Sequence, residues 1–235
     1  MITVQDIGNK VVYKAALKQV KKNLPKIKRL FKNKITKEEA EKIEVLAVNN
    51  TEIENLDFLK YFPNLLSLGM DYVIGINNIN GVQNCPNLEE FDLCNCDVKS
   101  LDGIVYCKNL TCFCYDFSEE YQQYGKSDFG FLKNLPELKV IILERNKLED
   151  VSIFANLHKV TTLILTRNPI TNIAPLKELK SLECLDVDYC KLTSLDGLGE
   201  FKSLKELGAA GNLFTEEQMS EYKQRYPQIE IFFED

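Results

Sequence analysis

Apolar residues recur along this chain at a nearly constant period. Segments that begin at residues 138, 160, 182 and 204 align without gaps at intervals of 22 residues, with apolar residues at repeat positions 1, 4, 6 and 11 and again near 14, 17 and 20. Further starts at 43, 65, 88 and 110 extend the register upstream, and the repeat that begins at 110 carries six extra residues. Eight repeats of one period indicate a solenoid of stacked coils.

The spacing inside each repeat predicts its local structure. Positions 4 and 6 alternate as in a strand, so their side chains point to one face and that of position 5 points to the other. Because no single coil can bury its own apolar residues, we expect the strands to stack in parallel over one continuous core. Position 9 is expected to bond the backbone of the turn and of the next coil, and it holds Asn146, Asn168, Cys190 and Asn212.

The repeats match the leucine-rich pattern LxxLxLxxN/CxL, most clearly through residues 170–176 (ITNIAPL) and 192–198 (LTSLDGL). On these residues the chain resembles the 22-residue bacterial leucine-rich-repeat proteins typified by internalins. The resemblance covers roughly residues 35–235. It implies an α/β fold, a curved solenoid or horseshoe with a parallel sheet on its concave face and helical caps at both ends.

Both ends carry cap signals. We expect a basic helical N-terminal cap over 1–42, the eight repeats over 43–212, and a helix-and-strand cap over 213–235. Thr215 reads as the N-cap of a helix over 216–226, and Thr36 and Glu39 read as a capping box. Pro25 is expected to divide a helical apolar stripe into two short helices. The stripe consists of Tyr13, Leu17, Val20, Leu24, Ile27 and Phe31.

Repeat positions 2, 3, 5, 7 and 8 are expected to line the exposed concave face. The candidate partner-binding residues there are Tyr72, Asp92, Asp116, Phe117, Ile142, Arg145, Ile164, Arg167, Asp186, Asp188 and Tyr189. Tyrosine and arginine are enriched at binding hot spots, so this face predicts a non-catalytic module that binds another protein. We expect an adaptor, a regulatory subunit or a bacterial effector, with a protein or peptide partner whose basic patch matches the acids. A solvated face with incidental aromatic residues is the alternative.

The insertion in the fourth repeat, roughly residues 118–130, is a second candidate contact. Insertions in repeat proteins often form binding loops, and Tyr121 and Tyr124 are the residues that would contact a partner. A tolerated surface loop explains the insertion equally well.

The charges are distributed unevenly. Residues 1–37 carry eleven basic side chains and one acidic one, whereas the remainder carries eighteen basic and thirty-four acidic ones. A basic segment of this kind indicates a cap over the first repeat, peripheral binding to an anionic membrane or nucleic acid, or docking on an acidic surface. The charge alone does not choose among them.

Catalytic and metal chemistry are not indicated. The chain has 8 Cys and one His, and Cys94 and Cys96, like Cys112 and Cys114, are two residues apart on a strand, which suits a shared metal ion poorly. His158 has no nucleophile beside it in the repeat pattern. We therefore expect no enzyme, metal or cofactor. With no apolar leader, we expect a monomeric cytoplasmic protein with reduced thiols, delivery into a host cell as an effector being left open.

Overall fold

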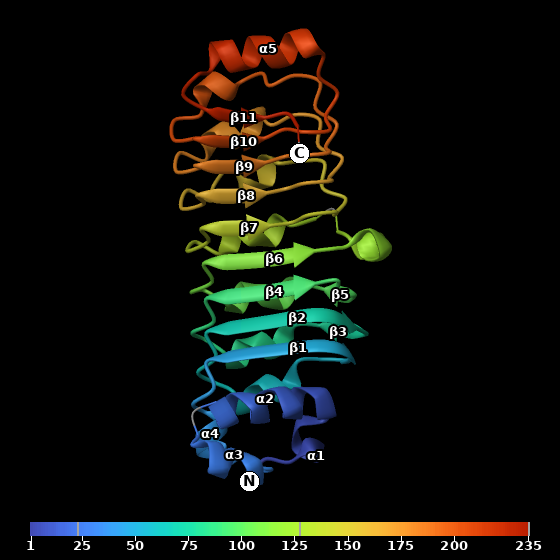
Figure 1. The fold of residues 1–235 in the computed structure, drawn as a ribbon, viewed down its shortest axis with the longest axis vertical. Helices are drawn as coiled ribbons and strands as arrows, with labels where there is room; N and C mark the ends of the chain where they lie inside the picture. The colour runs from blue at the N-terminus through green and yellow to red at the C-terminus, as the bar shows by residue number, and fades with distance from the viewer. Residues whose placement is uncertain (23, 127, 235) are drawn as a thin grey trace. The chain divides into compact units, whose positions relative to one another are not determined.

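The computed structural model describes residues 1–22, 24–126 and 128–234, apart from the side chains of Leu30 and Phe31. Within these residues the chain divides into two compact units, Met1–Leu110 and Thr111–Asp235. Figure 1 shows the elements of both. The division falls inside the predicted repeat array, and the predicted bounds of caps and repeats stay predictions.

The first unit begins with short helices and continues as coils of strand and 3₁₀ helix. Its helices are α1 (Val4–Ile7), α2 (Lys10–Lys22), α3 (Lys26–Phe31) and α4 (Lys37–Ala40), with 3₁₀ helices η1 (Asp57–Tyr61), η2 (Asn80–Asn84) and η3 (Asp102–Tyr106). Its strands are β1 (Val45–Glu52), β2 (Ser67–Ile74), β3 (Ile76–Asn78), β4 (Glu90–Cys94) and β5 (Val98–Ser100). β1, β2 and β4 pair in parallel in that order, and β3 pairs in parallel with β5.

The second unit repeats the same coil. Its strands are β6 (Cys112–Asp116), β7 (Val140–Ile142), β8 (Thr162–Ile164), β9 (Cys184–Asp186), β10 (Glu206–Gly208) and β11 (Glu230–Phe232). Its helices are η4 (Glu119–Tyr124), η5 (Gly130–Asn134), η6 (Ser152–Phe154), η7 (Ala174–Glu178), η8 (Leu198–Glu200) and α5 (Glu216–Arg225). Consecutive strands pair in parallel, and the register places Ile141, Leu163, Leu185 and Leu207 side by side.

The core of each unit is built from repeat positions 4 and 6. Leu163, Leu165, Leu185 and Val187 are all 0% exposed, as the strand periodicity predicts. Burying an aliphatic side chain of this size contributes about 1.5–3 kcal/mol, so the stack of coils supplies the main stabilising energy. Buried inner positions and parallel pairing confirm the predicted leucine-rich-repeat solenoid.

Where position 9 is asparagine, its side chain satisfies backbone groups at the turn that leaves the strand. Asn168 donates to the carbonyl oxygens of Leu143 (2.7 Å) and Leu165 (2.8 Å) and accepts from the Leu148 N–H (3.1 Å). Leu143 and Leu148 lie on the coil before that of Asn168. The prediction that position 9 bonds to the next coil is therefore wrong, because the bonds run to the preceding one. The Leu143 N–H also donates to the Ile164 carbonyl oxygen (2.9 Å), so the backbone of Leu143 faces the following coil, where the Asn168 amide reaches its carbonyl oxygen.

The same contact recurs at other coils where the residue is Asn. Asn146 donates to the Tyr115 carbonyl oxygen (2.7 Å), and Asn212 donates to that of Val187 (2.9 Å). At the position of Cys190 the thiol lies 3.6 Å from a carbonyl oxygen, which is a weak contact.

The predicted helix ends are confirmed. Thr36 with Glu39, and Thr215 with Gln218, form capping boxes at the starts of α4 and α5. Pro25 separates α2 from α3, and β11 adds a last parallel strand beside β10.

The predicted apolar stripe is only partly correct. Tyr13 is buried, together with Val12 and Ala16, but Ile27 is 74% exposed. The break before α3 starts a new helix axis, so the 3–4 spacing of α2 does not continue into it. The side chain of Phe31 lies outside the described residues.

Candidate functional site

The outward side chains of β7, β8 and β9 form one face of the second unit. Along each of these strands a half-buried residue precedes and follows a buried one. Ile142 and Ile164 are half-buried on this face, and Asp186 and Asp188 follow them on β9 and just beyond it. The face therefore changes from aliphatic to acidic along the stack.

Hydrogen bonds hold the two aspartates in place. Asp186 Oδ1 accepts from the Thr166 hydroxyl at 2.7 Å, and Asp188 Oδ1 accepts from the Ala210 N–H at 2.7 Å. Gly208 leaves the space that they need, because a Cβ there would lie 3.1 Å from Asp188 Oδ1. These carboxylates are fixed features of the surface.

The residue at repeat position 8 turns the chain off the strand in the left-handed region. Arg145 (φ 51°), Arg167 (φ 60°) and Tyr189 (φ 51°) all adopt this conformation. It costs an ordinary L-residue about 1–2 kcal/mol, and Gly and Asn adopt it most easily. The same backbone position holds Asn50, Tyr72, Asn95 and Gly211 in other repeats.

Three of these turns make a stack of side chains. The Arg167 guanidinium lies over the Tyr189 ring, 4.1 Å from its centroid. The ring also lies against Gly211, where an added Cβ would lie 2.4 Å from a ring carbon. The glycine thus gives Tyr189 room to lie flat, and the arginine covers the ring, in a cation–π arrangement.

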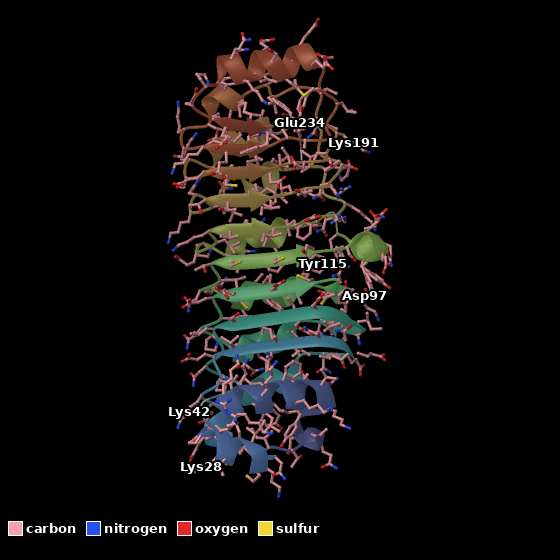
Figure 2. All side chains as sticks on the ribbon, in the orientation of Figure 1. Lys28, Lys42, Asp97, Tyr115, Lys191 and Glu234 are labelled. Carbon is pink, nitrogen blue, oxygen red and sulfur yellow. The ribbon has the colours of Figure 1, made fainter. Side chains whose placement is uncertain are left out.

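A hollow of about 290 Å³ opens beside this stack. Glu119 and Gln122 line it from the insertion, and Arg145, Arg167, Tyr189 and Lys191 line it from the exit turns. Figure 2 marks Lys191 on the side toward which the strand arrows point. The two parts of the sequence that were predicted separately as contacts therefore meet around one hollow.

The insertion is fastened to the turn that carries Arg145. Gly125 lies so close that a Cβ on it would be 2.9 Å from the Arg145 carbonyl oxygen. The Lys126 N–H donates to Asn146 Oδ1 at 2.9 Å, and the Lys147 N–H donates to the Lys126 carbonyl at 2.8 Å. These bonds give the insertion a defined wall beside the hollow.

Charge at the hollow is mixed. Arg145 pairs with Glu144 and also donates to the Phe117 carbonyl oxygen at 3.2 Å. Burial raises the pKa of Glu144, while Arg145 acts to lower it and the Asp116 carboxylate raises it further. The Glu144 carboxyl thus lies among other acids, and Arg145 is the main positive charge that stabilises its ionised form.

Phe117 is wrongly placed in the predicted binding set. Its side chain is 2% exposed and its ring packs edge-on against Tyr115 with centroids 5.0 Å apart. The insertion begins directly after Phe117, and Phe117 is not among the left-handed residues of position 8, so its ring turns into the core instead of outward.

The other predicted residues lie as follows. Asp116 is half-buried at the end of β6, and Tyr121 and Tyr124 of the insertion lie half-exposed with ring centroids 6.2 Å apart, outside the lining of the hollow. In the first unit, Tyr72 is 36% exposed and Asp92 is exposed. Sequence reasoning missed Lys191, Gln122 and Gly211, although Asn and Gly at position 8 were a signal that this position has a special backbone.

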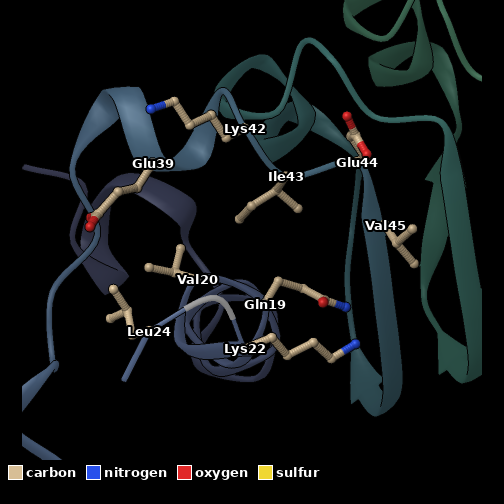
Figure 3. Close-up of a pocket in the computed structure, with 9 residues that line it drawn as sticks. All are labelled: Gln19, Val20, Lys22, Leu24, Glu39, Lys42, Ile43, Glu44 and Val45. Carbon is tan, nitrogen blue, oxygen red and sulfur yellow. The ribbon is translucent and has the colours of Figure 1, made fainter. Parts of the chain in front are cut away.

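The first unit has a basic surface of its own. A hollow of about 430 Å³ is lined by Leu17 and by the basic residues Lys14, Lys18, Lys21, Lys22 and Arg29. Figure 3 shows a second hollow of the first unit, where Val20, Leu24 and Ile43 face the space and Lys22 and Lys42 lie at its margin.

The cysteines offer little nucleophilic character where they are buried. Burial raises the pKa of Cys85, Cys96 and Cys107 to about 12, so these thiols stay protonated at neutral pH. His158 is exposed. The expectations of no metal and no catalysis stay predictions.

Among the helices described, none has the length and apolar character that crossing a bilayer requires.

No protein-family model and no curated protein matches the chain. Among solved structures, internalin C2 of Listeria monocytogenes is similar with a TM-score of 0.77 and 18% identity, over 96% of this chain and 93% of that one. A leucine-rich-repeat protein of Leptospira interrogans is similar with a TM-score of 0.56 and 19% identity, over 75% of this chain and 51% of that one. These likenesses confirm the leucine-rich-repeat fold typified by internalins.

Proposed function

We propose that the chain is a non-catalytic module that binds a protein partner through the outward face of β7–β9 and the exit turns beside it. The observation that carries this proposal is the left-handed backbone at Arg145, Arg167 and Tyr189. Asparagine or glycine would relieve the strain there, as Asn50 and Gly211 do at the equivalent positions. Bulky side chains at strained and accessible positions support a role in contact with a partner.

The charges on the face support a partner with basic residues. Asp186 and Asp188 are held by hydrogen bonds to Thr166 and to the Ala210 backbone, so they need no rearrangement when a cation approaches. Preorganised opposite charges steer encounter and fix the register of a complex. Such binding suits an adaptor, a regulatory subunit or an effector that acts as a monomer.

The test is a measured affinity for a partner captured from the native cell. We expect Asp186→Lys and Tyr189→Ala each to weaken binding by roughly tenfold or more, since each removes a contact worth about 1.4 kcal/mol or more. Glu178→Lys, the same charge reversal on the exposed part of η7, is the matched control and is expected to leave affinity unchanged. Equal losses in control and face variants, with folding intact by circular dichroism, would refute the proposal.

The second candidate is attachment to a polyanionic surface, either an anionic membrane or a nucleic acid, through the basic N-terminal segment. The specific observation in its favour is the hollow on α2 that Lys14, Lys18 and Lys21 line together with Lys22 and Arg29. Arg29 also donates to the carbonyl oxygens of Leu24 and Lys22, so it completes the end of α2 as well.

A further inference from the structure

The hollow beside the insertion differs in charge from the strands next to it. Arg145, Arg167 and Lys191 line it against a single acid, Glu119. Glu144, Asp186 and Asp188 project from or just beyond the neighbouring strands. A partner that only presented basic residues would therefore meet repulsion at this place.

Arg167 is presented to the hollow in a defined orientation. Its guanidinium lies 4.1 Å from the centroid of the Tyr189 ring, and the ring rests over Gly211. A guanidinium carries its N–H donors in a planar fork that matches the two oxygens of a carboxylate, and a cation–π contact does not use these donors. The ring thus preorganises Arg167, which lowers the entropy lost when an anion binds.

We infer that this hollow receives a carboxylate side chain of the protein partner, held by Arg167 and Lys191, while basic residues of the same partner lie over Asp186 and Asp188. The inference rests on the proposed function and names the chemistry of its contact. The volume of about 290 Å³ accommodates one such side chain.

The surrounding charges favour a carboxylate over a phosphate group. Arg145 is already paired with Glu144 and bonded to the Phe117 carbonyl, so Arg167 and Lys191 supply most of the uncompensated positive charge. Glu119 opposes them from the insertion. Arg167 and Lys191 together with Glu119 leave one net positive charge at the hollow, which one carboxylate neutralises, whereas a phosphate monoester with nearly two negative charges would leave an excess beside the neighbouring acids.

The first test is a titration with sodium acetate and, separately, inorganic phosphate at constant ionic strength, followed by NMR of the backbone amides and the Arg167 side-chain N–H. We expect saturable shifts at Arg167, Tyr189 and Lys191 with acetate. Arg167→Gln should raise the half-saturating concentration roughly tenfold, and Arg225→Gln, on exposed α5, should not change it. Identical titrations of Arg167→Gln and the intact chain, or saturation by phosphate at a lower concentration than by acetate, would overturn the inference.

The second test selects peptides from a random library on the intact chain and on Arg167→Glu. Enrichment of Asp or Glu next to Lys or Arg, lost or exchanged for a basic residue on Arg167→Glu, is the expected result. Selected peptides without an acid would overturn this inference and leave the proposed function standing. If no peptide is selected on either chain, the proposed function fails, and with it the inference that a partner fills the hollow, even where the acetate titration succeeds.

Discussion

Asn168 shows how much one side chain contributes to this repeat. Its amide and side-chain carbonyl oxygen bond three buried backbone groups, on Leu143, Leu165 and Leu148, that would otherwise lack these partners. Leaving a buried donor or acceptor unsatisfied costs about 1–3 kcal/mol for each group. Position 9 is therefore a structural position, whereas position 8, immediately before it, is exposed at Arg167 and Tyr189.

We expect Asn168→Ala to lower the free energy of unfolding by about 2–4 kcal/mol, because several of these bonds are lost at once. Urea denaturation followed by circular dichroism measures the change. Cys190→Asn is the matched variant at the next coil, where it replaces a weak thiol contact by an amide, and should be neutral or stabilising. A loss of stability in Cys190→Asn as large as that in Asn168→Ala would contradict the account.

The sequence predicted the environment of some residues in this region correctly and that of others wrongly. The strand alternation placed Leu163 and Leu165 in the core, because burial alternates with the pleat. It could not place Phe117, since the insertion that follows this residue changes the local backbone. Nor could it show the stack of Arg167 on Tyr189, which depends on the absence of a side chain at Gly211, one coil farther on.

At the scale of elements, α5 closes the second unit through one buried tyrosine. Tyr222 is 7% exposed, and its hydroxyl oxygen accepts from the Leu195 N–H at 3.1 Å. Phe214 packs edge-on against the Tyr222 ring with centroids 6.0 Å apart. The capping box of Thr215 starts the helix, but the tyrosine fixes it to the preceding coil.

Tyr222→Phe is expected to destabilise the protein by about 1–3 kcal/mol, because the Leu195 N–H would stay buried without a partner. Amide hydrogen exchange at Leu195 and the urea midpoint measure the local and global effects. Tyr226→Phe, at the half-buried end of α5, controls for the loss of a tyrosine hydroxyl. If both variants behaved alike, the bond to Leu195 would have no special weight.

The sequence predicted where these helices begin and end, but it did not predict which other segments of the chain they contact. Thr36, Pro25 and Thr215 mark helix ends through local chemistry, which needs no knowledge of the rest of the fold. The contact of the insertion with the Arg145 turn depends on the close approach at Gly125, which no local pattern reports. The candidate site was therefore predicted as two separate surfaces, although the structure brings them together at one hollow.

For the whole molecule, the net charge of -6 combines a strongly basic N-terminal segment with an acidic remainder. Opposite charges in one chain predict either that the two parts meet different neighbours or that they face each other. The basic side chains of α2 line a hollow, so their charge acts as a group on anything that approaches it. Screening by salt weakens such attraction strongly.

We expect the chain to sediment with phosphatidylcholine vesicles only when they contain phosphatidylserine, or to bind a DNA duplex, with an affinity that falls steeply as salt rises. The triple variant Lys14→Glu, Lys18→Glu, Lys21→Glu should weaken this binding roughly a hundredfold, at about 1 kcal/mol for each lysine. Reversing Lys108, Lys133 and Lys202 changes the net charge equally and is the control. Equal effects of the two triple variants would show that net charge, and not the α2 surface, is responsible.

The direction of the asparagine contacts has a consequence for chain growth. The Tyr115 carbonyl and the Lys126 N–H obtain their partner from Asn146, and the Leu143 carbonyl obtains its own from Asn168. During synthesis, a coil that has just left the ribosome therefore lacks these hydrogen bonds until the coil that follows it has also emerged. Deleting coils from the C-terminal end would therefore remove the asparagine partner of the last remaining coil, whereas deleting them from the N-terminal end would cost the ladder bonds to the preceding coil but leave every remaining carbonyl its asparagine.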